Sequence, residues 1–256
     1  MKLFKSRDQH LLVSKSILYR IIQLSELKED ETVLEVGCGT GNLTELLLRN
    51  SGKVIGIEKD ARFVRYLRSK FYDEIREGKF RLIHGDALRI NFPRFDKFIS
   101  NIPYSISTPL TFKLLESKFD LAIITYQQEF AERLTAREGE KSYGRISVAV
   151  KAYCRVKILF KVPRTAFRPI PKVDSAVVKL IPKPEIEVKD VDVFNDLLRT
   201  SFSMKRKLFG KVLKEWLKKY DAESVIDEFE EYLDLRPDHI PPEVYARIAD
   251  MVSENG

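Results

Sequence analysis

Residues 32–44 read TVLEVGCGTGNLT, and this stretch decides the fold. An apolar strand runs into Gly37, Gly39 and Gly41, and a helical pattern follows. Glycine lets the backbone turn tightly and approach a ligand closely, and a helix N-terminus presents free N–H groups. In the dinucleotide fingerprint Gly-x-Gly-x-x-Gly, the third glycine comes one residue later than here. The spacing therefore favours a ligand-binding loop of another type, with an ordinary strand-to-helix turn as the alternative.

Seven apolar stretches predict the strands of one sheet. The first begins at residue 32, and the others cover residues 53–58, 80–84, 96–100, 120–126, 154–162 and 175–181. Helical patterns separate the first five, including residues 60–76 and 108–115, and an amphipathic helix over residues 14–24 precedes them. Four successive strand–helix units argue for a parallel sheet with right-handed crossovers. We therefore expect an α/β fold with a Rossmann-like, mostly parallel, seven-stranded sheet.

Polar residues follow the ends of these predicted strands. Glu58 ends the second strand, 17 residues after Gly41. This is close to the interval at which a doubly wound fold places a carboxylate for ribose hydroxyls. Asp86 follows the third strand. Since ligands bind beyond the carboxyl ends of strands in open α/β sheets, we expect both carboxylates, with their neighbours Lys59 and Ala87, to line one site.

The stretch Asn101-Ile102-Pro103-Tyr104 follows the fourth predicted strand. The amide oxygen of Asn101 and a neighbouring backbone carbonyl can accept hydrogen bonds from an exocyclic amine, while the tyrosine ring can stack on the base that carries it. Pro103 fixes its own φ and pushes Ile102 towards extended geometry, so the Ile102 carbonyl is held at a set angle. A turn with a buried tyrosine is the alternative for these four residues taken alone. Their position at a strand end favours base recognition.

Composition excludes several classes of protein. The 256 residues are enough for one α/β domain with a smaller appendage, and 44% hydrophobic residues indicate a globular protein with a sizeable core. No apolar run reaches the length of about 18 residues that spans a membrane, and we expect no signal peptide, because no sustained apolar stretch follows the first residues. Cys38 and Cys154 have no metal-ligand spacing. We expect reduced thiols, a cytoplasmic location, no membrane partner and no metal.

Charge is unevenly distributed along the chain. Residues 221–256 hold eleven acidic residues and two arginines, and because the whole chain carries +7, residues 1–220 carry +16. Such a basic body fits a polyanion such as RNA, and a lysine-rich solvated surface is the alternative. Residues 199–219 contain eight basic residues and one acid. From this stretch we expect RNA contact by Lys205, Arg206, Lys207 and Lys211.

The same stretch has an apolar face at helical spacing, formed by Phe209, Val212, Leu213, Trp216 and Leu217. Residues 182–184 read Pro-Lys-Pro and are typical of a linker. We therefore expect two domains, residues 1–182 with the sheet and residues 183–256 with a small helical domain. A last short helix is expected after Pro241 and Pro242, at the end of the acidic tail.

Six motifs follow one another in a characteristic order. They are Gly-x-Gly-x-Gly at 37–41, Gly-Asp-Ala at 85–87, Asn-Ile-Pro-Tyr at 101–104, Gln-x-Glu-x-Ala-Glu-Arg at 127–133, Tyr-Gly-Arg at 143–145 and Phe-x-Pro-x-Pro-x-Val-Asp-Ser at 167–175. Over roughly residues 8–218 the chain resembles the ribosomal RNA adenine N6,N6-dimethyltransferases of the KsgA type, which act on the small subunit. It departs from the usual family pattern around residues 7–12, and at Ile102 and Ser105.

The resemblance implies a class I methyltransferase fold with S-adenosylmethionine (SAM) as cofactor, which methylates two adjacent adenosines at N6 and has a role in ribosome biogenesis. It implies a catalytic set in which Tyr104 and Phe167 hold the base from opposite faces: Asn101, Ile102, Pro103, Tyr104 and Phe167. It also implies a cofactor-binding set, with Asp86 on the adenine amino group: Gln9, His10, Leu12, Glu35, Gly37, Gly39, Gly41, Glu58, Lys59, Asp86, Ala87 and Asn101. Arg168 joins the RNA-binding residues, and we expect a monomer.

Two other functions are also compatible with the sequence. A macrolide-resistance type of enzyme, which acts on large-subunit rRNA, shares the Asn-x-Pro-Tyr/Phe chemistry, although the motifs at 127–133 and 167–175 favour the small-subunit type. A non-catalytic SAM-binding assembly or transcription factor could keep the same fold. The intact stretch from Asn101 to Tyr104 argues against this second function, because a binding protein has no need of that amide.

Overall fold

The computed structural model describes residues 10–255, and these residues form two compact units. The first unit comprises residues up to 131 together with 157–182, and the second comprises 132–156 together with 183 onwards. The chain passes between the units at three places among the described residues, and the predicted boundary after residue 182 is one of them. Residues 132–156, which lie within the predicted first domain, belong to the second compact unit.

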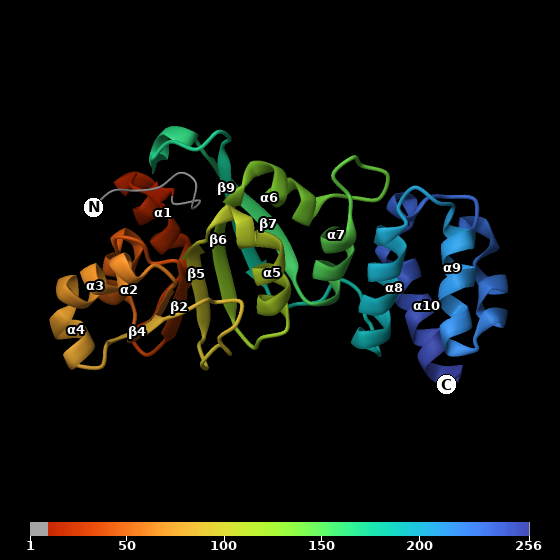
Figure 1. The fold of residues 1–256 in the computed structure, drawn as a ribbon, viewed down its shortest axis with the longest axis horizontal. Helices are drawn as coiled ribbons and strands as arrows, with labels where there is room; N and C mark the ends of the chain where they lie inside the picture. Colours follow the sequence, from red (N-terminus) through yellow and green to blue (C-terminus); the bar gives the residue numbers. More distant parts are fainter. Residues whose placement is uncertain (1–9, 256) are drawn as a thin grey trace. The chain divides into compact units, whose positions relative to one another are not determined.

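Seven strands form one sheet within the described part of the chain, as the sequence predicts (Figure 1). Their order across the sheet is β4 (Phe80–His84), β3 (Lys53–Glu58), β2 (Thr32–Val36), β5 (Lys97–Asn101), β6 (Leu121–Gln127), β9 (Ser175–Ile181) and β7 (Arg155–Val162). The five strands from β4 to β6 pair in parallel, and β9 pairs with β6 in the antiparallel direction. The strand order reverses between β2 and β5, which is where open α/β sheets bind ligands.

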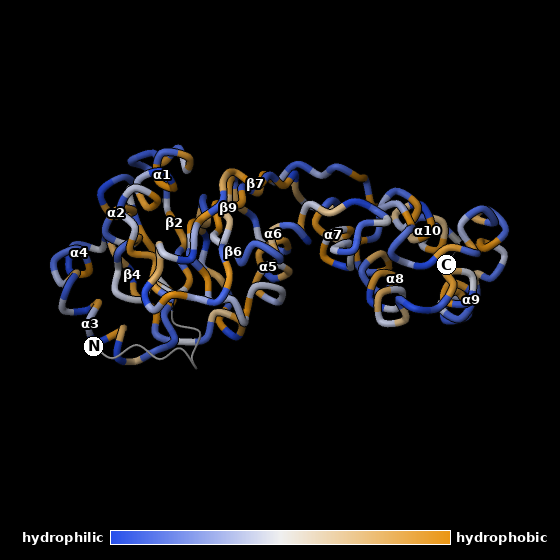
Figure 2. The backbone as a smooth tube through the Cα atoms, turned by 90° about the horizontal axis from the view of Figure 1, so that it is seen from above, coloured by the Kyte–Doolittle hydropathy of each residue, from blue (hydrophilic) through white to orange (hydrophobic). Residues whose placement is uncertain are grey.

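The five central strands β3, β2, β5, β6 and β9 are buried along nearly their whole length, which explains their continuous apolar sequences, whereas the edge strands β4 and β7 are partly exposed. Leu34 in β2 pairs with Ile55 on one side and Phe98 on the other, and all three side chains lie in the core. In Figure 2, hydrophobic residues follow the strands of the sheet, while the connecting segments are mixed or polar. A sheet that is buried on both faces holds its strand ends rigidly, and the candidate site depends on those ends.

The helices of the first unit are α1 (Lys15–Ser25), α2 (Asn42–Asn50), α3 (Ala61–Lys70), α4 (Tyr72–Arg76), α5 (Ser107–Leu115) and the start of α6 (Gln128–Thr135). A short 3-10 helix, η2 (Tyr104–Ile106), leads into α5. The prediction of one helix over residues 60–76 is wrong at Phe71, where φ is −115° and ψ is 39°. Phe71 is buried and its ring packs edge-on against Phe80, at 5.5 Å between centroids. Tertiary packing therefore interrupts the helix.

Two short strands that the sequence does not predict tie distant segments of the first unit together. β1 (Leu11–Leu12) pairs antiparallel with β8 (Phe167–Arg168), with Leu11 opposite Arg168 and Leu12 opposite Phe167. The Val13 N–H extends this contact by donating to the Ala166 carbonyl at 2.9 Å. The pairing brings the start of the described chain alongside the loop that precedes β9.

The second unit is helical. Its main elements are α7 (Arg145–Ala149), α8 (Val191–Ser203), α9 (Phe209–Leu217), the 3-10 segments η3 (Val150–Ala152), η5 (Lys218–Tyr220), η6 (Glu223–Tyr232) and η7 (Pro237–His239), and α10 (Pro242–Asn255). The predicted apolar face of α9 is confirmed, because all five of its side chains are buried. Asp196 accepts hydrogen bonds from Trp216, Lys219 and Tyr220 and so fixes the end of α9 to α8. The last helix, α10, is longer than expected, with 14 residues. None of the helices in the described residues has the length and apolar character that a membrane crossing requires.

Candidate active site

A cavity of about 650 Å³ lies at the carboxyl ends of β2, β3, β4 and β5. This volume falls within the range of small-molecule sites. The cavity is lined by eleven of the predicted site residues, namely His10, Gly37, Gly39, Glu58, Lys59, Asp86, Ala87, Asn101, Ile102, Pro103 and Tyr104. Four strand ends thus bring together residues that are far apart in the sequence.

The glycine loop forms the wall of the cavity after β2. Gly37 and Gly39 have φ values of +79° and +55°, which favour glycine. A Cβ on Gly39 would lie 2.5 Å from the Cδ2 atom of Leu11, so the loop also needs glycine for lack of space. Gly41 has a different task from the predicted one: it caps α2 and faces the Phe71 ring, and it does not line the cavity in the described structure.

Glu58 ends β3 and is almost fully buried. Its Oε2 atom accepts a hydrogen bond from the Gly39 N–H at 2.9 Å, and its Oε1 atom accepts one from the Asp60 N–H at 2.8 Å. Burial raises the pKa of the Glu58 carboxyl above its ordinary value. The two backbone donors hold the carboxylate in one orientation at the cavity wall, where its remaining lone pairs suit hydroxyl donors.

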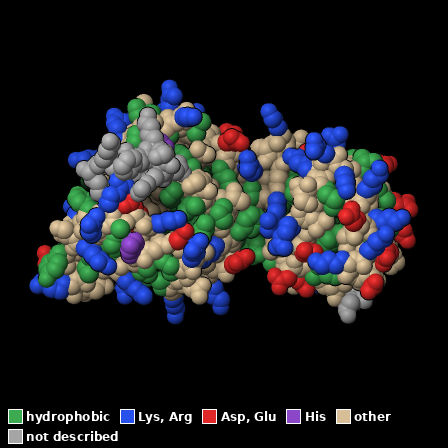
Figure 3. All heavy atoms as spheres, viewed as in Figure 1, with side chains coloured by type: hydrophobic (Ala, Val, Ile, Leu, Met, Phe, Trp, Pro, Cys, Tyr) green, Lys and Arg blue, Asp and Glu red, His purple; other side chains and the backbone are tan. Residues whose placement is uncertain are grey.

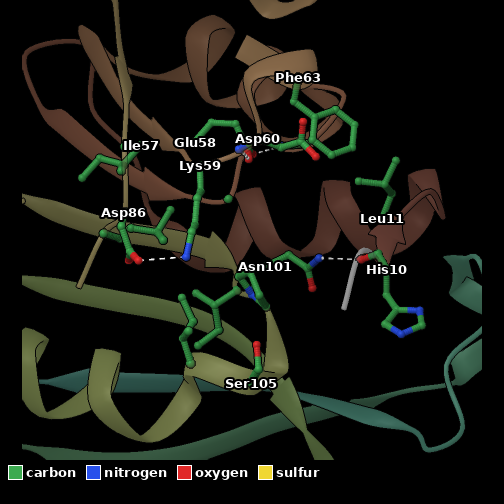
Figure 4. Close-up of a pocket in the computed structure, with 18 of the residues that line it drawn as sticks. His10, Leu11, Ile57, Glu58, Lys59, Asp60, Phe63, Asp86, Asn101 and Ser105 are labelled. Atoms are coloured by element: carbon green, nitrogen blue, oxygen red, sulfur yellow. Dashed lines mark hydrogen bonds and ion pairs between the residues drawn. The ribbon is translucent and has the colours of Figure 1, made fainter. Parts of the chain in front are cut away.

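Lys59 and Asp86 reach towards each other from the ends of β3 and β4 (Figure 4). The Lys59 Nζ atom lies 2.9 Å from Asp86 Oδ2, while Asp86 Oδ1 accepts a hydrogen bond from the Leu88 N–H at 3.0 Å. The hydrogen bond from Lys59 lowers the pKa of the Asp86 carboxyl. Asp86 therefore presents a fixed, ionised acceptor at this end of the cavity. Lys113 holds the following loop, because its Nζ atom donates to the carbonyls of Ala87 and Ile90.

Asn101 is the last residue of β5, and its amide is oriented by the start of the described chain. The Nδ2 atom donates to the His10 carbonyl at 3.2 Å, and Figure 4 shows the amide oxygen turned away from that contact. The Oδ1 atom is buried and has no hydrogen-bond partner among the described residues. A buried acceptor without a donor is costly, so a bound group with an N–H would satisfy it.

Pro103 and Tyr104 complete the stretch after β5. Pro103 has a φ of −59°, as its ring requires. The Tyr104 hydroxyl lies 2.7 Å from the Ser175 Oγ atom at the start of β9, which anchors the far end of the tyrosine side chain. The ring itself remains part of the cavity wall.

The structure differs from the prediction for Phe167. This side chain was expected to cover a base opposite Tyr104, but it is fully buried in the core and does not line the cavity in the described structure. The pairing of Leu12 with Phe167 draws both side chains into that core, so Leu12 is also absent from the cavity wall. The ring that stacks on Tyr104 is His10, with 5.8 Å between centroids and 22° between planes.

Two further residues of the predicted cofactor-binding set are Gln9 and Glu35. Gln9 lies outside the described residues. Glu35 is buried behind the glycine loop and does not line the cavity in the described structure. Its Oε2 atom accepts a hydrogen bond from Thr44 Oγ1 at 2.6 Å, and burial raises the pKa of the Glu35 carboxyl to about 7. Glu35 therefore links β2 to α2 from beneath the loop.

The predicted RNA-binding residues are distributed over both units. Arg168 is exposed in the first unit, and its guanidinium donates to the backbone carbonyls of Thr165 and Phe167. In the second unit, two of the predicted lysines form ion pairs. The Lys205 Nζ atom lies 3.3 Å from Asp238 Oδ2, and the Lys207 Nζ atom lies 3.8 Å from Glu215 Oε2. Arg206 and Lys211 are exposed. Figure 3 shows many Lys and Arg side chains on the visible face of each unit.

Several cavity residues were not predicted from the sequence. They are Leu11, Val36, Ile57, Asp60, Ala61, Arg62, Phe63, Gly85, Ser105 and Ile106. Most of them are immediate neighbours of predicted residues, or belong to the first turn of α3, which starts beside Glu58. The sequence signal for most of them is their position at or just after a strand end, where ligands bind in open α/β sheets. The described residues contain no cluster of three or more His, Cys, Asp or Glu side chains arranged to hold a metal ion.

The buried carboxyl of Glu35 predicts a pH-dependent stability. Because its folded pKa of about 7 exceeds the ordinary value of 4.5, the folded state binds a proton more tightly, and stability falls as pH rises from about 4.5 to 7. Glu35→Gln keeps an acceptor for Thr44 and removes this titration. We expect the variant to gain stability relative to wild type over that range, by about 3 kcal/mol at pH 8.

Denaturant unfolding at several pH values tests this prediction, with Glu116→Gln as a control at an exposed position. A constant difference between wild type and Glu35→Gln from pH 4.5 to pH 8 would show that Glu35 does not titrate in this range.

Several known proteins are similar to this chain over most of its length. The model of the family described as ribosomal RNA adenine dimethylase matches residues 2–248. The probable ribosomal RNA small subunit methyltransferase A of Methanosarcina acetivorans is 42% identical over 250 residues, which are 96% of this chain and 92% of that protein.

Two solved structures are similar as well. The dimethyladenosine transferase from Plasmodium falciparum has a TM-score of 0.79 at 34% identity, covering 93% of this chain and 96% of that one. The 23S rRNA methyltransferase ErmE has a TM-score of 0.69 at 25% identity, covering 95% of this chain and 99% of that one. With the family model matched over almost its whole length, this chain belongs to the ribosomal RNA adenine dimethylase family.

Proposed function

We propose that this protein transfers methyl groups from SAM to N6 of adenosines in small-subunit ribosomal RNA. The product is N6,N6-dimethyladenosine, at two adjacent nucleotides, and the protein acts as a monomer in ribosome biogenesis in the cytoplasm. The buried, unpartnered Oδ1 atom of Asn101 at the cavity wall carries the proposal. This atom is an acceptor placed where an exocyclic amine can donate.

The cavity fits the proposed cofactor. Glu58 offers a fixed carboxylate to the ribose hydroxyls, and Asp86 offers an ionised acceptor to the adenine amino group. Gly37 and Gly39 place the backbone of the loop after β2 on the cavity wall, in conformations that favour glycine. When bound, SAM supplies a methyl group already activated by its sulfonium centre. The chain itself contributes binding, orientation and exclusion of water.

The adenine amino nitrogen is a poor nucleophile because its lone pair is delocalised into the ring. Hydrogen bonds from its two N–H groups to Asn101 Oδ1 and to the Ile102 carbonyl draw the nitrogen towards tetrahedral geometry and localise that pair. Pro103 holds the Ile102 carbonyl in place. Alignment of the reacting atoms contributes about 7–11 kcal/mol in well-oriented reactions. No strong base is required, because the methylated nitrogen is acidic enough to lose its proton to water.

The target base enters the site only after it leaves the RNA stack, at a cost of a few kcal/mol. The Tyr104 ring offers an aromatic surface, and stacking on such a surface contributes about 1–3 kcal/mol per base. The 5.8 Å between the His10 and Tyr104 ring centroids is too small for a base to lie between them, since stacked bases are about 3.4 Å apart and an intervening base needs two such layers. The base therefore replaces His10 on Tyr104 or uses the opposite face of that ring.

The RNA specificity is testable directly. We expect radiolabelled methyl transfer from SAM to unmodified small ribosomal subunits, with N6,N6-dimethyladenosine as the labelled nucleoside in mass spectrometry. Large subunits serve as the parallel substrate, because ErmE is similar over 95% of this chain and its name gives 23S rRNA as its substrate. Methylation confined to large-subunit RNA would overturn the small-subunit assignment in favour of that alternative.

Replacing Asn101 separates catalysis from binding. Asn101→Ala removes one of the two acceptors for the amine, and we expect methyl transfer to fall about 10²–10³-fold, as for loss of one positioned hydrogen bond in other transition states. SAM affinity by calorimetry and RNA affinity, measured in parallel, show how much of the loss lies in the transfer step. Asn50→Ala, at an exposed position on α2, is the matched control. Unchanged transfer by Asn101→Ala would remove this amide from the mechanism, whereas wild-type protein that binds SAM and RNA without transfer would indicate a non-catalytic factor.

The basic surface of the second unit predicts a salt-dependent contribution to RNA binding. Arg206 and Lys211 are exposed, and replacing both with Ala should reduce the slope of log K against log salt by about 1.5 if each contacts one phosphate. The double variant Lys28→Ala and Lys53→Ala removes the same charge beside the amino ends of β2 and β3. Identical slopes for the two double variants would identify Arg206 and Lys211 as a merely solvated surface.

A further inference from the structure

Residues 169–174 form a loop at the rim of the cavity, between β8 and β9. The Pro169 carbonyl accepts a hydrogen bond from His10 Nδ1 at 2.8 Å, and His10 lines the cavity and stacks on Tyr104. The loop residues are not among the described residues that line the cavity. The loop therefore contacts the cavity wall at His10, the residue whose ring covers one face of Tyr104.

This rim loop is held at both ends. Before it, β8 pairs with β1. After it, the Asp174 carbonyl accepts from the Gln128 N–H at 3.0 Å, and Asp174 Oδ1 accepts from the Arg164 N–H at 2.9 Å. Pro169 and Pro171 fix their own φ values, and Pro171 is buried. A segment restrained in this way keeps its shape when a partner binds, so little ordering entropy is lost.

Large aliphatic side chains are exposed on this restrained loop. Ile170 is 44% exposed and Val173 is 45% exposed. Arg168 and Lys172, on either side of Ile170, are exposed cations. A partner with phosphates suits the cations, and an apolar tip between them suits the faces of bases. RNA offers both features at once.

When the target adenosine leaves the RNA stack, a gap remains between its two neighbouring bases. Restacking of those neighbours or return of the adenosine would close the gap, and both compete with binding of the base in the cavity. Proteins that distort nucleic acids insert apolar side chains, isoleucine among them, between neighbouring bases. We propose that Ile170 is such a wedge, which fills the gap left by the target adenosine while Val173 extends the apolar contact. The proposal rests on the proposed function, because the gap exists only if a base is turned out into the cavity. An aliphatic wedge has no hydrogen-bonding groups, so it supports extrusion without reading sequence.

The test uses an RNA fragment that the wild-type protein methylates. Ile170→Ser removes the apolar tip, and we expect kcat/KM for RNA to fall about tenfold or more, since the unstacking cost is no longer offset. Ile170→Met keeps a flexible apolar group and should stay within about threefold of wild type. Ile181→Ser is the matched control, because Ile181 is 39% exposed at the end of β9. SAM affinity and thermal stability should be the same in all variants.

A second RNA isolates the wedge from general apolar contact. In this RNA a base that neighbours the target adenosine is replaced by an abasic nucleotide, so the stack is already open. We expect Ile170→Ser and wild type to differ much less on this RNA than on the intact one. Equal losses on both RNAs, wild-type rates for Ile170→Ser on the intact RNA, or failure of Ile170→Met as severe as that of Ile170→Ser would each overturn the wedge. Absence of methyl transfer by the wild type would instead overturn the proposed function, whatever Ile170 does.

Discussion

The hydrogen bond from Asn101 Nδ2 to the His10 carbonyl decides which end of a primary amide faces the cavity. An amide has a donor end and an acceptor end of nearly the same shape, so shape alone cannot fix its orientation. The His10 carbonyl can accept a hydrogen bond only from the amide nitrogen, Nδ2. The amide oxygen, Oδ1, is therefore left buried and without a donor among the described residues. Recognition of an amine therefore depends on a contact between residues 91 positions apart in the sequence.

That contact exists because β1 and β8 hold the start of the described chain against the loop before β9. The same pairing draws Leu12 and Phe167 into the core and leaves His10 at the cavity. One short antiparallel pair thus positions the carbonyl that orients Asn101, the ring that covers Tyr104 and the anchor of the rim loop. Features that look independent in the sequence share one structural support.

The carboxylates of the site are held by different means for different tasks. Glu58 is buried, its pKa is raised, and backbone N–H groups fix it in place. Asp86 pairs with Lys59, which lowers its pKa and keeps it ionised as an acceptor. Glu35, the most deeply buried of the three, faces Thr44 behind the loop and supports the structure, although its position in the motif predicts cofactor contact.

The sequence by itself determined the seven strands, the glycine loop and the strand-end residues Glu58, Asp86 and Asn101, because strand pattern and chain reversal depend on neighbouring residues. Only the tertiary structure decided that Phe71 interrupts a helix, that Phe167 is buried and that His10 stacks on Tyr104. These outcomes depend on side-chain packing between segments far apart in the chain. A two-residue strand such as β1 carries too little periodicity to reveal its partner in advance.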